Sequence, residues 1–184
     1  MAAAKQLFST KGFHQTAMSE LASQAMISTG QIYRLFANKS DIIVAIVQDD
    51  TIQRIEVMNA IARDVDARKI EVLEAIRLIL LSSIEHGDEA LSFEILAEGH
   101  RSEAVAQTIG QLCEAYREVL RGFALRVNTA MAEEAQKAAE ELLLACMFGL
   151  GHRALSRSKL SDQETARRSA DMIYAALRQD SEAG

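Results

Sequence analysis

The 184-residue chain contains no proline and no tryptophan, and only nine of its residues are aromatic. Because proline interrupts helices, its absence beside plentiful Ala, Leu, Glu, Gln and Arg predicts long, uninterrupted helices. The longest apolar run, residues 142–151, is shorter than the about 20 residues that cross a membrane. No secretory signal is visible, and Cys113 and Cys146 form no closely spaced metal-ligand pair. We therefore expect a cytoplasmic protein with reduced thiols and without a metal or a cofactor.

The net charge of −6 is unevenly distributed along the chain. Residues 1–48 carry four cationic and two acidic side chains, a net charge of +2, and the remaining residues carry −8. A mildly basic amino-terminal part joined to an acidic body is typical of a protein that meets phosphate groups at one end only.

Helical periodicity runs through the whole sequence, without an alternating strand pattern or an internal repeat. It predicts an all-α fold of about nine helices: residues 2–10, 18–24, 28–36, 38–63, 69–85, 89–98, 102–128, 130–155 and 162–178. The first three helices form a compact helix-turn-helix domain over residues 1–47. The long helices of residues 48–184 form a bundle for ligand binding and dimerisation. No flexible linker separates the two.

Residues 18–36 combine a short helix, a three-residue turn and a second short helix, which is the arrangement that places the second helix in the major groove of DNA. Ser28 and Gln31 have the spacing of a capping box at the start of the second helix. Gly30, in its first turn, costs roughly 1 kcal/mol relative to alanine. A close approach of the backbone to DNA would offset that cost.

Three polar side chains near this helix suit phosphate binding: Tyr33, Arg34 and Lys39. Each has a competing interpretation. Tyr33 can pack on the fourth helix, and the two cations can be merely solvated. Gln31 is ambiguous as well, because a capping role and a base contact compete for one side chain. Asn38 is expected to cap the fourth helix, with Asp41 three residues later.

Residues 3–47, AAKQLFSTKGFHQTAMSELASQAMISTGQIYRLFANKSDIIVAIV, resemble the amino-terminal domain of the TetR (tetracycline-repressor-like) family of bacterial transcription regulators. The resemblance implies phosphate contacts at Thr16, Tyr33 and Lys39. It also implies a recognition helix that starts at Ser28, Thr29, Gly30 and Gln31. Two positions depart from the family pattern: Ala17 stands where a Ser or Thr cap is frequent, and Met26 where a turn glycine is frequent.

The same resemblance implies a DNA-binding regulator that binds a palindromic operator as a homodimer through the helices at 130–155 and 162–178. A repressor released by a small effector is the favoured form. The Leu, Ile and Met content of the fifth to eighth helices indicates an apolar or amphipathic effector. Side chains that can border its cavity, with plain core packing as the competing role of each, are Met58, Phe93, Cys113, Tyr116, Arg117, Cys146 and Met147.

Two other classes of protein remain as alternatives. A helical dimerisation or ligand-binding module without DNA binding is compatible with the acidic body. An all-α enzyme is less well supported, because no paired acid and base and no nucleophile signature is present. The histidines His86, His100 and His152 lack metal-ligand spacing, and we expect them to be structural or surface residues.

Overall fold

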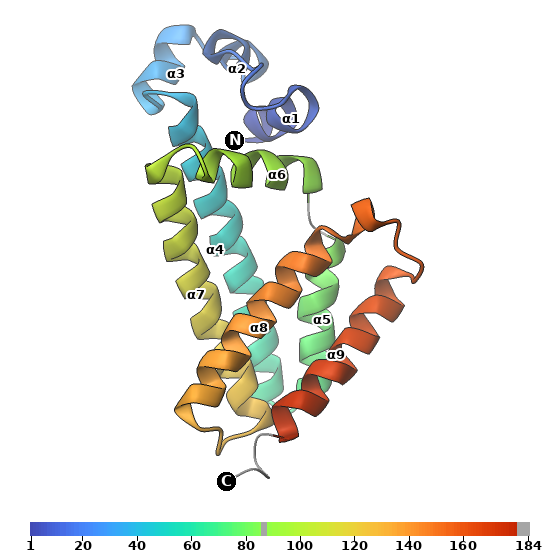
Figure 1. Ribbon diagram of the computed structural model, residues 1–184. Helices are drawn as coiled ribbons and strands as arrows, with labels where there is room; N and C mark the ends of the chain where they lie inside the picture. Colours follow the sequence, from blue (N-terminus) through green and yellow to red (C-terminus); the bar gives the residue numbers. More distant parts are fainter. Residues whose placement is uncertain (86–87, 180–184) are drawn as a thin grey trace. The chain divides into compact units, whose positions relative to one another are not determined.

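The computed structural model describes residues 1–85 and 88–179 of the chain. Within these residues it has nine α-helices, one short 3-10 helix and no strand, which confirms the all-α prediction (Figure 1). The helices are α1 (Ala2–Lys11), α2 (Met18–Gln24), α3 (Thr29–Leu35), α4 (Lys39–Asp66), α5 (Val72–Glu85), α6 (Glu89–Gly99), α7 (Glu103–Val127), α8 (Glu133–Gly151), η1 (Arg153–Ser156) and α9 (Asp162–Gln179).

The chain divides into two compact units. Unit 1 comprises Met1–Gln53 and Asp88–Leu112, and unit 2 comprises Arg54–Gly87 and Cys113–Gly184. The helices α4 and α7 each contribute residues to both units. This division does not coincide with the predicted boundary at residue 47, because α6 and the first part of α7 belong with the amino-terminal helices.

The core of unit 1 is built from α1, α2, α3, α6 and the first parts of α4 and α7. Phe8, Ile43 and Ile46 have no exposed surface in it. The ring of Phe13 meets that of Phe8 edge to face, with 5.3 Å between the ring centroids. Helices α1 and α6 pack against each other, and so do α2 and α3 (Figure 1).

Polar contacts join α6 to the amino-terminal helices within unit 1. The backbone N–H of Phe13 donates to the Glu94 carboxylate at 2.8 Å, and the Ser40 hydroxyl donates to Glu98 at 2.9 Å. Asp88 caps the start of α6 by accepting the N–H of Leu91. These bonds account for the place of α6 in the same compact unit as α1 to α3.

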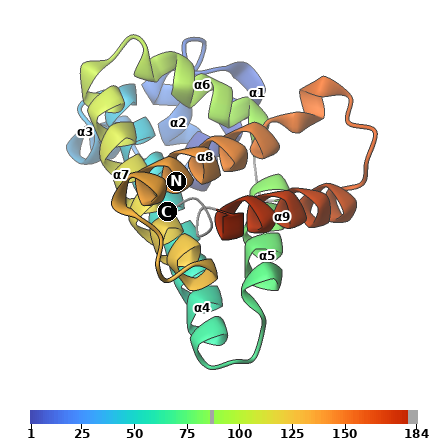
Figure 2. The same ribbon diagram turned by 60° about the horizontal axis from the view of Figure 1, so that its bottom comes forward.

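The core of unit 2 is centred on α5, whose buried face includes Ala75, Ile76, Ile79 and Leu80. Both α8 and α9 pack against α5, and Figure 2 shows α9 crossing α5. Phe123 and Leu120 of α7 complete the same core. A helix buried on so broad a face stabilises the unit by removing apolar surface from water.

Several helix boundaries differ from those predicted: α5 and α8 each begin three residues later than expected. The ends of α4 and α8 also differ, and there the backbone gives the reason. Helix α4 ends three residues later than expected, and Arg68 then adopts a left-handed conformation with φ of 56°. The N–H of Arg68 donates to the Val65 carbonyl, and the N–H of Lys69 donates to the Asp64 carbonyl. This is the pattern of a Schellman motif. Helix α8 ends at Gly151, because the backbone at His152 leaves the helical region and η1 follows.

Candidate nucleic-acid interface

The turn between α2 and α3 is closed by a Schellman motif. The N–H of Ile27 donates to the Ala22 carbonyl at 3.0 Å, and the N–H of Met26 donates to the Ser23 carbonyl at 3.1 Å. Met26 has φ of 55° and a side chain that is 92% exposed. A methionine therefore fills a left-handed position that glycine usually takes, at a cost of about 1–2 kcal/mol. The motif fixes the angle at which α3 leaves α2.

The start of α3 is held by the predicted capping box. The Ser28 hydroxyl accepts the N–H of Gln31 at 3.1 Å, and the Gln31 side-chain oxygen accepts the N–H of Ser28 at 2.8 Å. This geometry confirms the predicted cap, and it commits the side-chain oxygen of Gln31 to the protein. A second reciprocal cap starts α4, where Asn38 accepts the N–H of Asp41 and Asp41 accepts that of Asn38.

The helix α3 presents an exposed face opposite a single buried anchor. Ile32 is 4% exposed and enters the core of unit 1. The exposed residues of the helix are Thr29, Gly30, Gln31, Tyr33, Arg34 and Leu35. Tyr33 is 53% exposed, so its hydroxyl is not held in the core. A β-carbon added at Gly30 would meet only the Ser28 hydroxyl, at 4.0 Å, so nothing inside the protein requires glycine there.

Two residues expected at the phosphates are engaged inside unit 1. Thr16 is 1% exposed, and its hydroxyl donates to the Gly12 carbonyl at 2.9 Å. The Lys39 ammonium donates to the Phe13 carbonyl at 2.6 Å and to the His14 carbonyl at 3.2 Å. It also lies 4.7 Å from the centroid of the Phe13 ring. In this conformation both side chains hold the loop between α1 and α2.

This arrangement of short helices, a tight turn and an exposed second helix has a counterpart among known sequences. Residues 1–46 match the family of bacterial regulatory proteins described as the tetR family. The amino-terminal quarter of the chain is thus similar to the DNA-binding domain of the tetR family.

Curated relatives of the chain are named regulators. The chain is 32% identical over 104 residues to the HTH-type transcriptional regulator UidR of Escherichia coli, an overlap of 56% of this chain and 52% of the relative. It is 28% identical over 123 residues to the fatty acid metabolism regulator protein of Bacillus subtilis, covering 65% and 61%. The chain thus matches about half to three fifths of the length of these relatives. These relatives are named regulators and not enzymes, in agreement with the prediction from the sequence.

Solved structures of other proteins share this fold over nearly the whole chain. A TetR-family regulator from Mesorhizobium loti has a TM-score of 0.75 at 17% identity, covering 96% of this chain and 91% of the other. The regulator FadR from Bacillus subtilis, in complex with stearoyl-CoA, has a TM-score of 0.75 at 18% identity, covering 95% of both chains. GusR of Salmonella enterica has a TM-score of 0.68 at 21% identity, covering 95% of this chain and 92% of the other.

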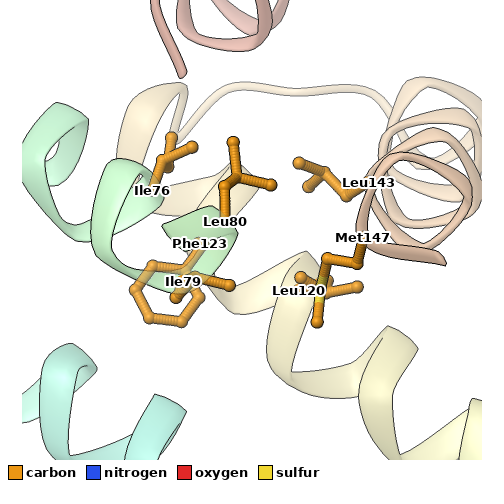
Figure 3. A pocket seen from close by; sticks show the side chains of 7 residues that line it. All are labelled: Ile76, Ile79, Leu80, Leu120, Phe123, Leu143 and Met147. Carbon is orange, nitrogen blue, oxygen red and sulfur yellow. The ribbon is translucent and has the colours of Figure 1, made fainter. Parts of the chain in front are cut away.

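Unit 2 contains a small, wholly apolar cavity between α5, α7 and α8 (Figure 3). Its lining consists of Ile76, Ile79, Leu80, Leu120, Phe123, Leu143 and Met147. The space in it that the centre of a water molecule can reach is about 10 Å³. The cavity can therefore hold about one water molecule. Any larger molecule can enter only if these helices move apart.

The predicted ligand-binding residues are distributed over several places in the fold. Met147 lines the cavity, whereas Met58, Cys113 and Tyr116 belong to the unit 2 core or pack against it. The other three lie elsewhere: Phe93 on α6 in unit 1, Arg117 in ion pairs with Glu114 and Glu141, and Cys146 on the exposed side of α8. The apolar periodicity of the sequence did not identify the α5 residues that line the cavity, because it does not show which buried residues border a void.

No group of three or more potential metal ligands occurs in residues 1–85 and 88–179. His86 lies outside these residues. Burial raises the pKa of the Cys113 thiol above its ordinary value, so this thiol stays protonated at neutral pH and is a poor nucleophile. Over the same part of the chain, no helix is long and apolar enough to span a membrane.

The exposed sides of α8 and α9 carry large apolar side chains. Leu142 of α8 is 66% exposed and Phe148 is 40% exposed, while Met172 of α9 is 75% exposed. Cys146 lies one helical turn beyond Leu142 on the same face of α8. These are the two helices from which resemblance to the TetR family predicts a dimer.

Proposed function

We propose that this protein is a cytoplasmic, ligand-responsive transcriptional regulator that binds a palindromic operator as a homodimer. The exposed face of α3 carries the proposal. A capping box fixes the start of this helix, and Ile32 is its one buried residue. The Schellman motif before it sets the angle between α2 and α3. In helix-turn-helix proteins the second helix of such a pair lies in the major groove. The relatives named transcriptional regulators support the same assignment.

In the proposed complex, α3 enters the major groove with Ser28, Thr29 and Gly30 leading. The absence of a side chain at Gly30 lets the backbone approach the bases. Tyr33 donates its hydroxyl to a phosphate on the groove edge. Thr16 and Lys39 act from inside unit 1 by holding the loop before α2. Two subunits place their α3 helices about 34 Å apart, one turn of DNA.

The dimer is proposed to form through the exposed apolar side chains of α8 and α9. Leu142 and Met172 are the most exposed large apolar residues of these helices. Exposed apolar side chains that gather on one face mark interaction surfaces. A palindromic operator requires a second subunit related to the first by two-fold symmetry. In such a dimer, the α8 and α9 face of one subunit packs against the same face of the other.

The effector of the proposed regulator carries an apolar chain, because every lining side chain of the unit 2 cavity is apolar. The related structure of Bacillus subtilis FadR contains stearoyl-CoA, which supports an acyl chain as the class of effector. Since the cavity has room for little more than a water molecule, the effector has to separate α5, α7 and α8. Because α7 contributes residues to both units, such a displacement acts on both, and DNA affinity falls.

Tyr33→Phe tests the proposed interface by removing one hydroxyl. We expect binding to the operator and to an unrelated duplex to weaken by the same factor, about 1–2 kcal/mol per half-site, because a phosphate contact carries no sequence information. Fluorescence anisotropy with labelled duplexes measures both affinities, with Tyr116→Phe in unit 2 as the control. Unchanged affinity of Tyr33→Phe contradicts the phosphate contact. A failure of the unmodified protein to bind any duplex contradicts the proposed function.

Stearoyl-CoA tests the effector class. Added to the preformed protein–operator complex, it is expected to release the DNA, whereas acetyl-CoA, with the same headgroup and almost no chain, is expected to have little effect. Burial of an acyl chain contributes about 0.8 kcal/mol per methylene, which explains the difference. The loss of anisotropy of the labelled operator reports the release. An equal response to both compounds, or to neither, rules out an acyl chain as the recognised group.

A further inference from the structure

Most cations of unit 1 already have partners inside the unit. Four of the five Lys and Arg side chains are engaged: Lys5 with Asp50, Lys11 with Glu20, Lys39 with the Phe13 and His14 carbonyls, and Arg101 with the His14 ring. The hydrogen bond from Lys11 lowers the pKa of the Glu20 carboxyl, so that pair stays charged at neutral pH. Arg34 has no hydrogen bond or ion pair to any of the residues that the structure describes. Its guanidinium is free to bind another molecule.

The position of Arg34 on α3 points it away from the protein. Successive residues of a helix are about 100° apart, so Arg34 and Gly30 each lie about 160° from the buried Ile32. Helical side chains lean toward the amino terminus of the helix, so that of Arg34 extends over the turn that contains Gly30. A β-carbon at Gly30 would have no neighbour closer than 4.0 Å. The guanidinium therefore has open space next to Gly30, which has no side chain.

The other polar side chains of this face are poorly suited to two-point recognition of a base. The Gln31 side-chain oxygen is bound to the Ser28 N–H at 2.8 Å, and reading an adenine with two hydrogen bonds needs both the oxygen and the nitrogen of the amide. Thr29 and Tyr33 each offer a single hydroxyl. An arginine offers a planar pair of N–H donors that matches the O6 and N7 acceptors of guanine in the major groove.

We propose that Arg34 determines operator specificity by donating two hydrogen bonds to one guanine in each half-site. This inference rests on the proposed function and deepens it, because it changes Arg34 from a phosphate contact to a base contact. It predicts a guanine at one fixed position of each half-site. It also separates the roles of the cations: Arg34 reads sequence, and Lys39 holds the loop between α1 and α2.

The test compares Arg34→Ala and Arg34→Lys with the unmodified protein on a palindrome selected from random DNA and on a shuffled duplex. Lysine keeps the charge but lacks the paired donors. We expect both variants to lose about 5- to 150-fold in affinity per half-site on the palindrome. On the shuffled duplex, Arg34→Lys is expected to match the unmodified protein. Arg63→Ala, which removes an exposed arginine of α4 in unit 2, is the matched control and is expected to leave both affinities unchanged.

A base analogue makes the test specific for the guanine. Replacing it by 7-deazaguanine removes the N7 acceptor, and this is expected to weaken binding of the unmodified protein but not of Arg34→Ala. The inference is overturned if the analogue weakens both proteins equally. It is also overturned if Arg34→Lys keeps the full preference for the palindrome, or if Arg34→Ala loses the same factor on both duplexes. DNA binding by the unmodified protein persists in all three cases, so these results leave the proposed function intact.

Discussion

A variant with Leu142→Glu and Met172→Glu is expected to be a monomer that binds the palindromic operator about 10²–10⁴-fold more weakly than the unmodified protein. Both side chains are largely exposed, at 66% and 75%, so the substitutions remove little internal packing. In the proposed dimer they would put like charges opposite each other at an interface that excludes water. Each subunit then has to find its half-site alone and loses the gain in effective concentration that its partner supplies.

Sedimentation velocity measures the oligomeric state, and anisotropy measures the operator affinity of the same samples. The matched control is Val57→Glu, which adds a charge at an apolar residue of α4 that is 50% exposed, in the same unit but outside α8 and α9. We expect the control to remain a dimer with unchanged affinity. If the double variant stays dimeric, or if its monomer binds the palindrome as well as the unmodified protein does, the proposed interface is wrong.

Lys39→Met is expected to lower the free energy of unfolding by about 1.5–3 kcal/mol, the range for hydrogen bonds to a charged group. Methionine keeps most of the apolar stem but cannot donate to the carbonyls of Phe13 and His14, and it loses the attraction of the ammonium for the Phe13 ring. The loop between α1 and α2 then loses its tie to the start of α4. Operator affinity is expected to fall because α2 and α3 are held less firmly.

Urea unfolding followed by circular dichroism measures the stability loss, and a salt titration of operator binding separates the two possible roles of Lys39. If Lys39 neutralises a phosphate, its replacement reduces the slope of log affinity against log salt concentration by about 0.9 per phosphate, whereas a loop tie leaves that slope unchanged. The control is Lys11→Met, which removes an ion pair with Glu20 at the surface, where solvent screening leaves such pairs with little effect on stability. Unchanged stability with a reduced salt slope would show that Lys39 binds phosphate instead.

The local features of α3 could be predicted from the sequence because they depend on neighbours in the chain. Ser28 and Gln31 are three residues apart, as a capping box requires, and the structure places both bonds as expected. The same holds for Asn38 and Asp41 at the start of α4. Such contacts need no knowledge of the tertiary fold.

The contacts of Lys39 and the cavity lining could not be predicted in the same way. The Phe13 and His14 carbonyls lie 26 and 25 residues from Lys39 in the sequence, and only the packing of unit 1 brings them to its ammonium. The cavity depends on which buried residues of three separate helices leave a void. An apolar periodicity shows that Ile76 or Leu120 is buried, but it does not show what lies opposite.

Selection from random duplex DNA, followed by binding of the enriched duplex at several salt concentrations, tests most directly whether α3 reads an operator. We expect enrichment of a palindrome whose half-sites are about 10–10.5 base pairs apart from centre to centre, bound with an affinity that falls steeply as salt rises. Recovery of no common sequence by the folded protein, or binding that is indifferent to sequence, would contradict the account.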